Sequence, residues 1–260
     1  MINDDLNLLD GWLGVNHLRL NVEKTKYLIF GNSTWVDGYQ VLYNNKIIEK
    51  VFNYCYLGLV IDFKLNWHEH INSIKKSISP YVFVIKRMRN IVERKYLMLI
   101  FNSYVHSRLL YLNPIWSGAP QCRMDELEII RKRALKFIKG VHVRFPTVEL
   151  FDEFSSLQII CIRELLIIIY KIINNLIVHN LIITRSGEHY EYNLRNAALY
   201  SRDYFNKNLS SRNNLLYRGI PLFNKLPDKI QSSPTLKFFK EQMKIFVDLN
   251  KNLFIYNLNQ

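Results

Sequence analysis

The sequence predicts an α+β fold, in which a small antiparallel sheet with one helix is followed by a mainly α-helical region. Up to Asp62, short apolar runs alternate with turn residues, which is typical of strands. Beyond Asp62, apolar residues recur every three or four positions, which is typical of helices. The net charge also changes there, from −2 over residues 1–62 to +11 over 63–145 and +4 over 146–260. We therefore expect three domains with these boundaries.

The elements of residues 1–62 follow from local patterns. Leu6, Leu9 and Leu13 have helical spacing and predict a first helix. The paired asparagines Asn44 and Asn45, between two alternating arms, predict a tight hairpin turn. Apolar runs at Tyr27–Phe30 and Asn53–Ile61 predict two further strands.

The elements after Asp62 are predicted to be helices. Trp67, Ile71 and Ile78 fall on one helical face, and Ser79-Pro80 predicts a break, with Pro80 opening a second helix. Residues 185–234 are polar and rich in Asn and Ser, so we expect them to be irregular. Further helices are expected at about 93–110, 124–139 (ended by Gly140), 156–174 and 235–250.

Charge and composition limit the classes of partner. A net charge of +13, concentrated in residues 63–145, favours a polyanion as partner, although a basic face that meets only solvent is the alternative. The apolar run 157–183 is interrupted by Arg163, Glu164 and Lys171, so no membrane partner is expected. The three cysteines lack metal-site or disulfide spacing, which favours a reducing, intracellular location.

Two groups of residues carry side chains of metal-binding types, and no metal site is expected from either. Asp4-Asp5 has the position of a helix start rather than of a hairpin between two strands. His68-Glu69-His70 opens a helix and has no third ligand at a convincing spacing. Aromatic residues interleave with the basic ones, and we expect two or three of them at the surface and the rest in the core. They are Tyr81, Phe83, Tyr96, Phe101, Tyr104, Tyr111 and Trp116.

These pieces, in this order, resemble the C-terminal part of the reverse transcriptase of non-LTR (LINE-type) retrotransposons. The resemblance covers nearly the whole chain, and each motif in it is short. The motifs are DLNLLDGW at 5–12, LRLNVEKTKYLIF at 18–30, YLG at 56–58 with ID at 61–62 and LNW at 65–67, YVHS at 104–107, YNLRN at 192–196, and LFNKLP at 222–227 followed by FFK at 238–240. Phe223 stands where the family usually has Trp.

The resemblance implies a role for several residues. Residues 1–62 would be the end of a polymerase palm, including a hairpin like the family's primer grip. The basic helices of 63–145 would be the thumb, and residues 146–260 the helical C-terminal region. Lys24 would be a candidate general acid for the pyrophosphate leaving group, and Tyr56, Leu57 and Gly58 would position the primer end of RNA or DNA primer-template. The residues expected to contact phosphates are Lys75, Lys76, Lys86, Arg87, Arg94 and Lys95.

The family's catalytic aspartates and fingers would lie upstream of Met1, so a missing palm and fingers polypeptide is an expected partner. Mg²⁺ is expected only for the intact parent enzyme, and no cofactor is expected for this chain. Strands near 26–30 and 54–61 would then expose apolar edges. The alternatives are a non-catalytic nucleic-acid-binding module and a helical protein–protein scaffold, although the scaffold does not explain the uneven charge.

Overall fold

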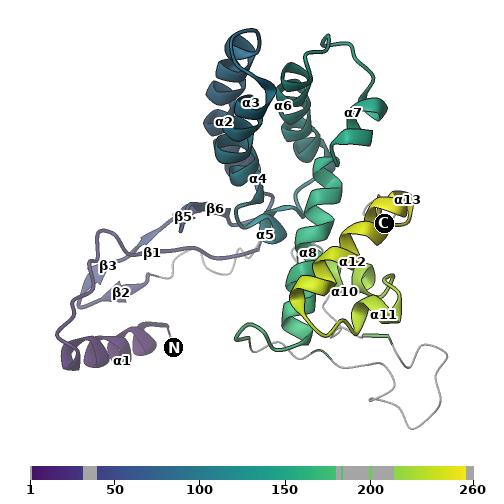
Figure 1. Ribbon diagram of the computed structural model, residues 1–260. Coiled ribbons are helices and arrows are strands. Elements are labelled where there is room, and N and C mark those ends of the chain that lie inside the picture. The colour runs from purple at the N-terminus through teal and green to yellow at the C-terminus, as the bar shows by residue number, and fades with distance from the viewer. Residues whose placement is uncertain (1, 32–39, 180–182, 184–198, 201–213, 256–260) are drawn as a thin grey trace. The chain divides into compact units, whose positions relative to one another are not determined.

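The computed structural model of the protein describes residues 2–31, 40–179, 183, 199–200 and 214–255 (Figure 1). The chain forms two units, Met1–His70 and Ile71–Gln260. Among the residues that the structure describes, the first unit holds helix α1, three two-stranded ladders and the first residues of α2, and the second unit is helical. The predicted α+β class is confirmed at this level. Within the described ranges, no helix combines the length and the apolar character that crossing a membrane requires.

Helix α1 (Ile2–Val15) packs on the hairpin of strands β2 (Leu42–Tyr43) and β3 (Lys46–Ile47). The side chain of Asn3 accepts a hydrogen bond from the Leu42 amide at 3.1 Å, and Asp10, two turns further, accepts one from the Tyr43 hydroxyl. Leu6 lies between them on the same face and packs against the core of this unit. One face of α1 is therefore held on the hairpin by two polar contacts, at Asn3 and Asp10, with the apolar contact of Leu6 between them.

The predicted hairpin turn at Asn44-Asn45 is confirmed. Strands β2 and β3 are antiparallel and pair Tyr43 with Lys46, which leaves a two-residue loop. Asn44 and Asn45 have φ values of 48° and 60°. A two-residue hairpin loop with both residues left-handed is the geometry that asparagine tolerates best after glycine.

The prediction of a purely antiparallel sheet is wrong for one pair of strands. Strand β1 (Lys26–Tyr27) pairs with β4 (Glu49–Lys50) in parallel. The intervening chain includes the β2–β3 hairpin, and after it β4 runs in the same direction as β1. The ion pair between Lys26 Nζ and Glu49 Oε2, at 2.5 Å, lies at the paired residues and favours this register. Strand β1 is also shorter than the predicted Tyr27–Phe30 strand.

The single strand predicted over Asn53–Ile61 is a hairpin. Strands β5 (Asn53–Tyr56) and β6 (Leu59–Asp62) are antiparallel, and Leu57-Gly58 forms the turn with φ values of 49° and 79°. The glycine tolerates this left-handed conformation, so the chain reverses where we predicted a continuous strand. All four residues of β5 are exposed.

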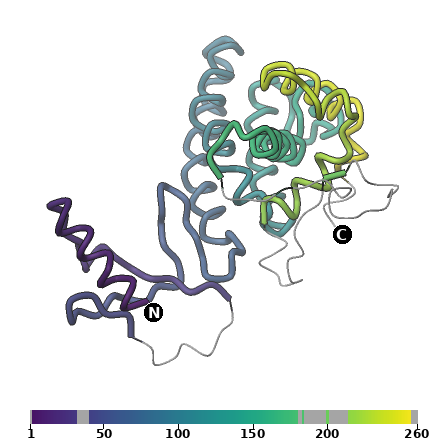
Figure 2. The backbone as a smooth tube through the Cα atoms, turned by 90° about the horizontal axis from the view of Figure 1, so that it is seen from below, coloured from purple at the N-terminus to yellow at the C-terminus, as the bar shows by residue number. Residues whose placement is uncertain are grey.

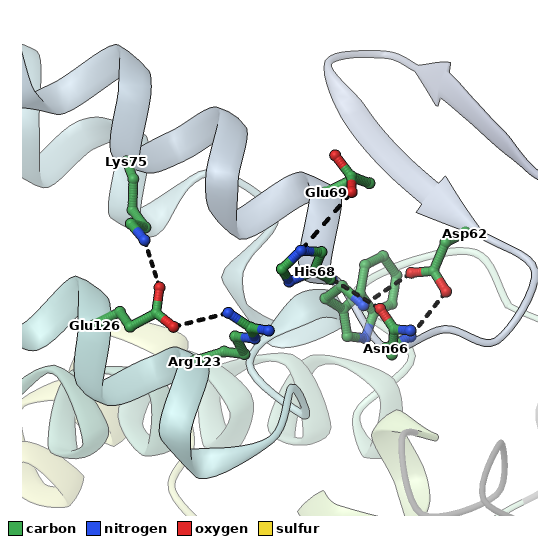
Figure 3. A network of polar contacts seen from close by, with 8 residues as sticks. Asp62, Asn66, His68, Glu69, Lys75, Arg123 and Glu126 are labelled. Carbon is green, nitrogen blue, oxygen red and sulfur yellow. Dashed lines mark hydrogen bonds and ion pairs between the residues drawn. The ribbon is translucent and has the colours of Figure 1, made fainter.

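The carboxylate of Asp62 organises the segment between β6 and α2. One of its oxygens accepts the amides of Lys64 and Asn66 at 3.1 Å, and the other accepts the Trp67 amide at 2.8 Å (Figure 3). Leu65 and Trp67 have φ values of 53° and 61°, which are uncommon for residues with side chains of this size. The three hydrogen bonds to one buried carboxylate offset the cost of that conformation.

The predicted break at Ser79-Pro80 is wrong, because α2 runs uninterrupted from His68 to Met88. Pro80 has no amide to donate to the Lys76 carbonyl. The surrounding carbonyls have other donors: Ser79 Oγ donates to the Lys75 carbonyl at 2.7 Å, and the Arg108 side chain donates to the Ser77 carbonyl. The apolar stripe of α2 is buried on both sides of Pro80, and its burial favours one continuous helix.

The helix predicted at about 93–110 is confirmed, with a π-helical segment inside it. Its parts are α3 (Arg94–Ile100), the π-helix η2 (Phe101–His106) and α4 (Ser107–Leu110). Leu97, Phe101, Val105 and Leu109 are all at most 3% exposed. A four-residue step overshoots one α-helical turn by about 40°, so four such residues would drift off one face. The wider turns of η2 offset that drift and keep all four in the core.

The remaining predicted helices are also present. Gly140, with φ of 74°, ends α6, and the side chains of Ser156 and Thr235 cap α8 and α12. The helices of this part of the chain are α5 (Asn113–Trp116), α6 (Gln121–Lys139), α7 (Thr147–Glu153), α8 (Leu157–Ile173), α10 (Leu215–Phe223), α11 (Asp228–Gln231), α12 (Leu236–Leu249) and α13 (Lys251–Ile255).

The prediction that residues 185–234 are irregular is wrong for α10 and α11. Asn214 caps α10, and Leu216, Ile220 and Phe223 bury one face of it against the core around α8. Figure 2 looks almost along α8, with α12 beside it. The polar composition of the wider segment concealed this short amphipathic helix. The tail motif at 192–196 lies outside the described residues.

The units differ from the predicted domains. The chain divides at His70 and Ile71, eight residues after the predicted boundary at 62, and both later predicted domains fall within the second unit. Helices α6 and α8, which lie on either side of residue 145, contact each other, and the Glu128 carboxylate in α6 accepts the Leu157 amide at the start of α8.

Gly219 provides a test of the packing between α8 and α10. A Cβ atom at this position would lie 2.4 Å from Cγ1 of Ile169. We expect Gly219→Ala to lower the free energy of unfolding by about 1–3 kcal/mol, because the added methyl overpacks the core. Gly11, also helical, has no atom within 4 Å of the equivalent position, so Gly11→Ala should stabilise α1 by about 0.5–1 kcal/mol. Urea unfolding of both variants checks the opposite signs.

Asp62 provides a second test of stability. We expect Asp62→Ala to lower the free energy of unfolding by about 1–3 kcal/mol, because the amides of Asn66 and Trp67 lose a charged acceptor. Asp62→Asn keeps one acceptor oxygen and should lose less. Asp125→Ala, an exposed control in α6, should change stability by less than about 0.5 kcal/mol. Urea unfolding followed by tryptophan fluorescence checks this order, and an Asp62→Ala variant as stable as the control would contradict it.

Candidate nucleic-acid interface

The candidate residues fall into two groups, one in each unit. The first group was expected to hold the primer end and the leaving group, and it consists of Lys24, Tyr56, Leu57 and Gly58. The second group was expected to contact phosphates, and it consists of Lys75, Lys76, Lys86, Arg87, Arg94 and Lys95. Each group is described within its own unit.

Lys24 lies in a turn that precedes strand β1. The side-chain oxygen of Asn21 accepts the Lys24 amide at 3.0 Å, and the Asn21 carbonyl accepts the Thr25 amide at 3.0 Å. The Tyr54 hydroxyl, in β5, donates to the Lys24 carbonyl at 3.4 Å. The Lys24 side chain is exposed. The structure therefore brings the backbone of Lys24 beside the hairpin that carries the other three candidates.

Tyr56, Leu57 and Gly58 form the tip of the β5–β6 hairpin. Tyr56 is 59% exposed and Leu57 is 70% exposed. The sequence predicted these residues within a strand, where their side chains would alternate between two faces. The turn at Leu57-Gly58 instead places the exposed side chains of Tyr56 and Leu57 at one end of the hairpin.

The groups considered for metal binding have the positions predicted for them. Asp4 and Asp5 lie in the first turn of α1, where carboxylates favour the helix dipole, and no strand flanks them. His68, Glu69 and His70 open α2, and the Nδ1 atom of His70 accepts the Val60 amide at 3.3 Å. Over the residues that the structure describes, no three His, Cys, Asp or Glu side chains come together as a metal site.

Two of the predicted phosphate contacts are engaged within the second unit. Lys75 in α2 pairs with Glu126 in α6, which also pairs with Arg123 at 2.8 Å (Figure 3). The hydrogen bond from Lys75 lowers the pKa of the Glu126 carboxyl. Arg94 at the start of α3 pairs with Glu153 in α7 in the same way. Both cations link helices of the fold, so we do not assign them to a ligand.

The other four predicted cations are exposed. Lys76, Lys86 and Arg87 lie on α2, and Lys95 lies on α3. Lys95 also pairs with Glu93 at 2.9 Å, but both side chains are more than 60% exposed, so water and salt weaken this pair.

Aromatic side chains accompany these exposed cations. The Arg87 guanidinium lies 5.5 Å from the ring centroid of Phe83, and the Lys95 ammonium lies 4.9 Å from that of Tyr96. Phe83 and Tyr96 are 56% and 50% exposed. Flat rings beside cations can stack bases while the cations contact phosphates.

The expectation that most of the seven aromatic residues lie in the core is wrong. Phe101 and Trp116 are buried in the core. Four rings are exposed, which is one more than expected: Phe83, Tyr96, Tyr104 and Tyr111. Arg108 was not among the predicted residues, and its guanidinium lies 5.0 Å from the ring centroid of Tyr81. Arg108 lies four residues after Tyr104, and this helical spacing could have indicated that the two side chains lie on one face of the helix.

Several cations of the second unit are buried and hold its core together. Arg131 is 2% exposed, pairs with Glu128 at 3.2 Å and donates to the Ser155 carbonyl at 2.7 Å. Burial raises the pKa of Glu128 and lowers that of Arg131, because it disfavours both charged forms. Arg218 donates to the Pro114 carbonyl at 2.6 Å, and burial lowers its pKa to about 10. The formal charge of this region therefore overstates the charge that it presents to a partner.

No protein-family model, curated protein or solved structure was found to match this chain.

Proposed function

We propose that this chain binds single-stranded or primer-template nucleic acid through α2 and α3. The observation that carries the proposal is the pairing of exposed cations with exposed aromatic rings, Arg87 with Phe83 and Lys95 with Tyr96. The second unit carries 29 Lys and Arg against 14 Asp and Glu, a net charge of +15, which favours a polyanionic partner.

We further propose that the chain is the end of the palm, the thumb and the tail of a reverse transcriptase of the non-LTR retrotransposon type. The order of the sequence motifs supports this, as does an α+β unit followed by a helical one. In this proposal Lys24 is the candidate leaving-group acid, and the hairpin tip at Tyr56, Leu57 and Gly58 positions the primer end. The parent enzyme would use Mg²⁺ and aspartates that these 260 residues do not supply.

The alternative is a non-catalytic nucleic-acid-binding module, either a relic or a piece adopted by its host. Asp4 and Asp5 lie in the first turn of α1 and not on a hairpin between two strands, which is compatible with both proposals. Both proposals require the same binding surface, and they differ in whether a second polypeptide completes an active site.

Two matched double variants test the binding surface. Lys86→Gln with Arg87→Gln removes two charges from α2, and Lys237→Gln with Lys240→Gln removes two exposed charges from α12. We expect the first pair to weaken binding of a labelled single-stranded RNA by about ten-fold and to reduce the slope of log K against log salt by about 1–2, because up to two phosphate contacts are lost. The α12 pair should change neither quantity. Fluorescence anisotropy at several salt concentrations checks this.

Two outcomes of that titration would count against the proposal. Binding that ignores ionic strength would exclude phosphate contacts as its source. Equal weakening by the two double variants would show that only the total charge matters, and not the surface formed by α2 and α3.

Primer extension tests the chemistry separately. We expect the 260-residue chain, with primer-template, nucleotides and Mg²⁺, to extend no primer, because nucleotidyl transfer uses two metal ions and the described residues hold no group of three or more His, Cys, Asp and Glu side chains that could bind one. A known reverse transcriptase in parallel reactions serves as the positive control. Extension above background by this chain would sink the prediction.

A further inference from the structure

Tyr104 belongs to a stack of rings between α2 and the π-helix η2. Its ring lies 4.4 Å from that of Tyr81, centroid to centroid, with 8° between the ring planes. The Arg108 guanidinium lies 5.0 Å from the Tyr81 centroid, and it also donates to the Ser77 carbonyl of α2. Tyr81 therefore has two flat neighbours, one of which is tied to the backbone of α2.

The stack is open at Tyr104. Tyr81 covers one face of the Tyr104 ring at stacking distance, yet Tyr104 is 46% exposed. The exposed area therefore comes from the other face and the edge of the ring. The neighbouring Val105 is fully buried and fixes η2 at this point, so the exposed ring is held on a rigid support.

The π-helix contributes to this exposure. Phe101 and Val105 face the core through the wide turns of η2, and Tyr104 is consequently directed toward Tyr81 and away from the core. Short π-helical segments inside longer helices are frequent at functional sites. An exposed, pre-positioned face of this kind stacks a flat ligand at little cost in side-chain entropy.

The surrounding charges indicate which flat ligand fits. Lys76 is exposed and directly precedes Ser77, the residue to which Arg108 is bonded. Arg87 is exposed on α2 and Lys95 is exposed on α3. A nucleotide combines a planar π-system with a nearby negative charge, and it therefore fits this surface. Because duplex bases already stack on their neighbours, an unpaired nucleotide is the form that offers a free face.

We propose that the exposed face of Tyr104 is a stacking site for one unpaired base of a single-stranded nucleic acid. This inference rests on the proposed function, since it assigns one base-binding position to the same surface. It also separates two contributions to binding: cations that contact any phosphate backbone, and one ring that requires a base.

Two probes and four variants test the inference. The probes are a labelled single-stranded oligonucleotide and an abasic strand of equal length and charge, measured against the full chain by anisotropy. We expect Tyr104→Ala to bind the base-bearing strand about five-fold to about a hundred-fold more weakly and to bind the abasic strand with unchanged affinity, because only base stacking is lost.

Tyr104→Phe keeps the ring and should bind both probes like the native chain. Tyr104→Leu keeps apolar bulk without a π-face and should resemble Tyr104→Ala, which tests stacking even if the alanine variant is less stable. Leu99→Ala, which removes an exposed aliphatic side chain from the same helical run, should change neither probe.

The outcomes distinguish this inference from the proposed function. If the native chain binds the base-bearing and abasic strands equally, or if Tyr104→Ala and Tyr104→Leu bind the base-bearing strand like the native chain, the stacking site is wrong while binding to a polyanion stands. If the native chain binds neither probe, the proposed function fails. Equal weakening of both probes by Tyr104→Ala would also overturn the inference, because a loss of structure and not of stacking explains it.

Discussion

The fold of the second unit depends on the burial of α8. Nine of its residues are buried, and they face α5, α6, α10, α12 and α13 in turn. A helix that is apolar on most of its circumference must be enclosed by other helices. Its first turn is enclosed as well, and there the Glu128 carboxylate accepts the Leu157 amide while Arg131 neutralises that carboxylate. The apolar run that resembled a membrane segment in composition is the centre of a helical core.

This core determines which charges remain for a partner. Arg131, Arg163 and Arg218 make their hydrogen bonds within the unit, and Lys75 and Arg94 connect neighbouring helices. Cations with carboxylate partners across helices contribute little net attraction for a distant polyanion. The charge that is free to act at the surface is therefore smaller than the sequence total, and part of it, at Arg87 and Lys95, lies beside exposed aromatic rings.

The sequence predicted those elements whose signals are local. Gly140, Ser156 and Thr235 each mark a helix end through their own backbone or side chain, and Asn44-Asn45 marks a turn in the same way. The parallel pairing of β1 with β4 and the ion pair of Lys75 with Glu126, 51 residues apart, were not predictable, because both require the tertiary arrangement. For the candidate site, the sequence predicted the exposed cations on α2 and α3. It did not distinguish them from Lys75 and Arg94, which pair with carboxylates of neighbouring helices.

The π-helix between α3 and α4 has a consequence for how this surface tolerates change. A π-helical turn holds about one residue more than an α-helical turn, so it acts as a single-residue insertion within a longer helix. If the same residues formed a regular α-helix, the extra residue would no longer be absorbed and everything after it would rotate by about 100°. Arg108 would then leave the Ser77 carbonyl and the Tyr81 ring, and Leu109 would leave the core. The π-helical conformation of this segment, and not only its composition, therefore keeps the aromatic stack in place.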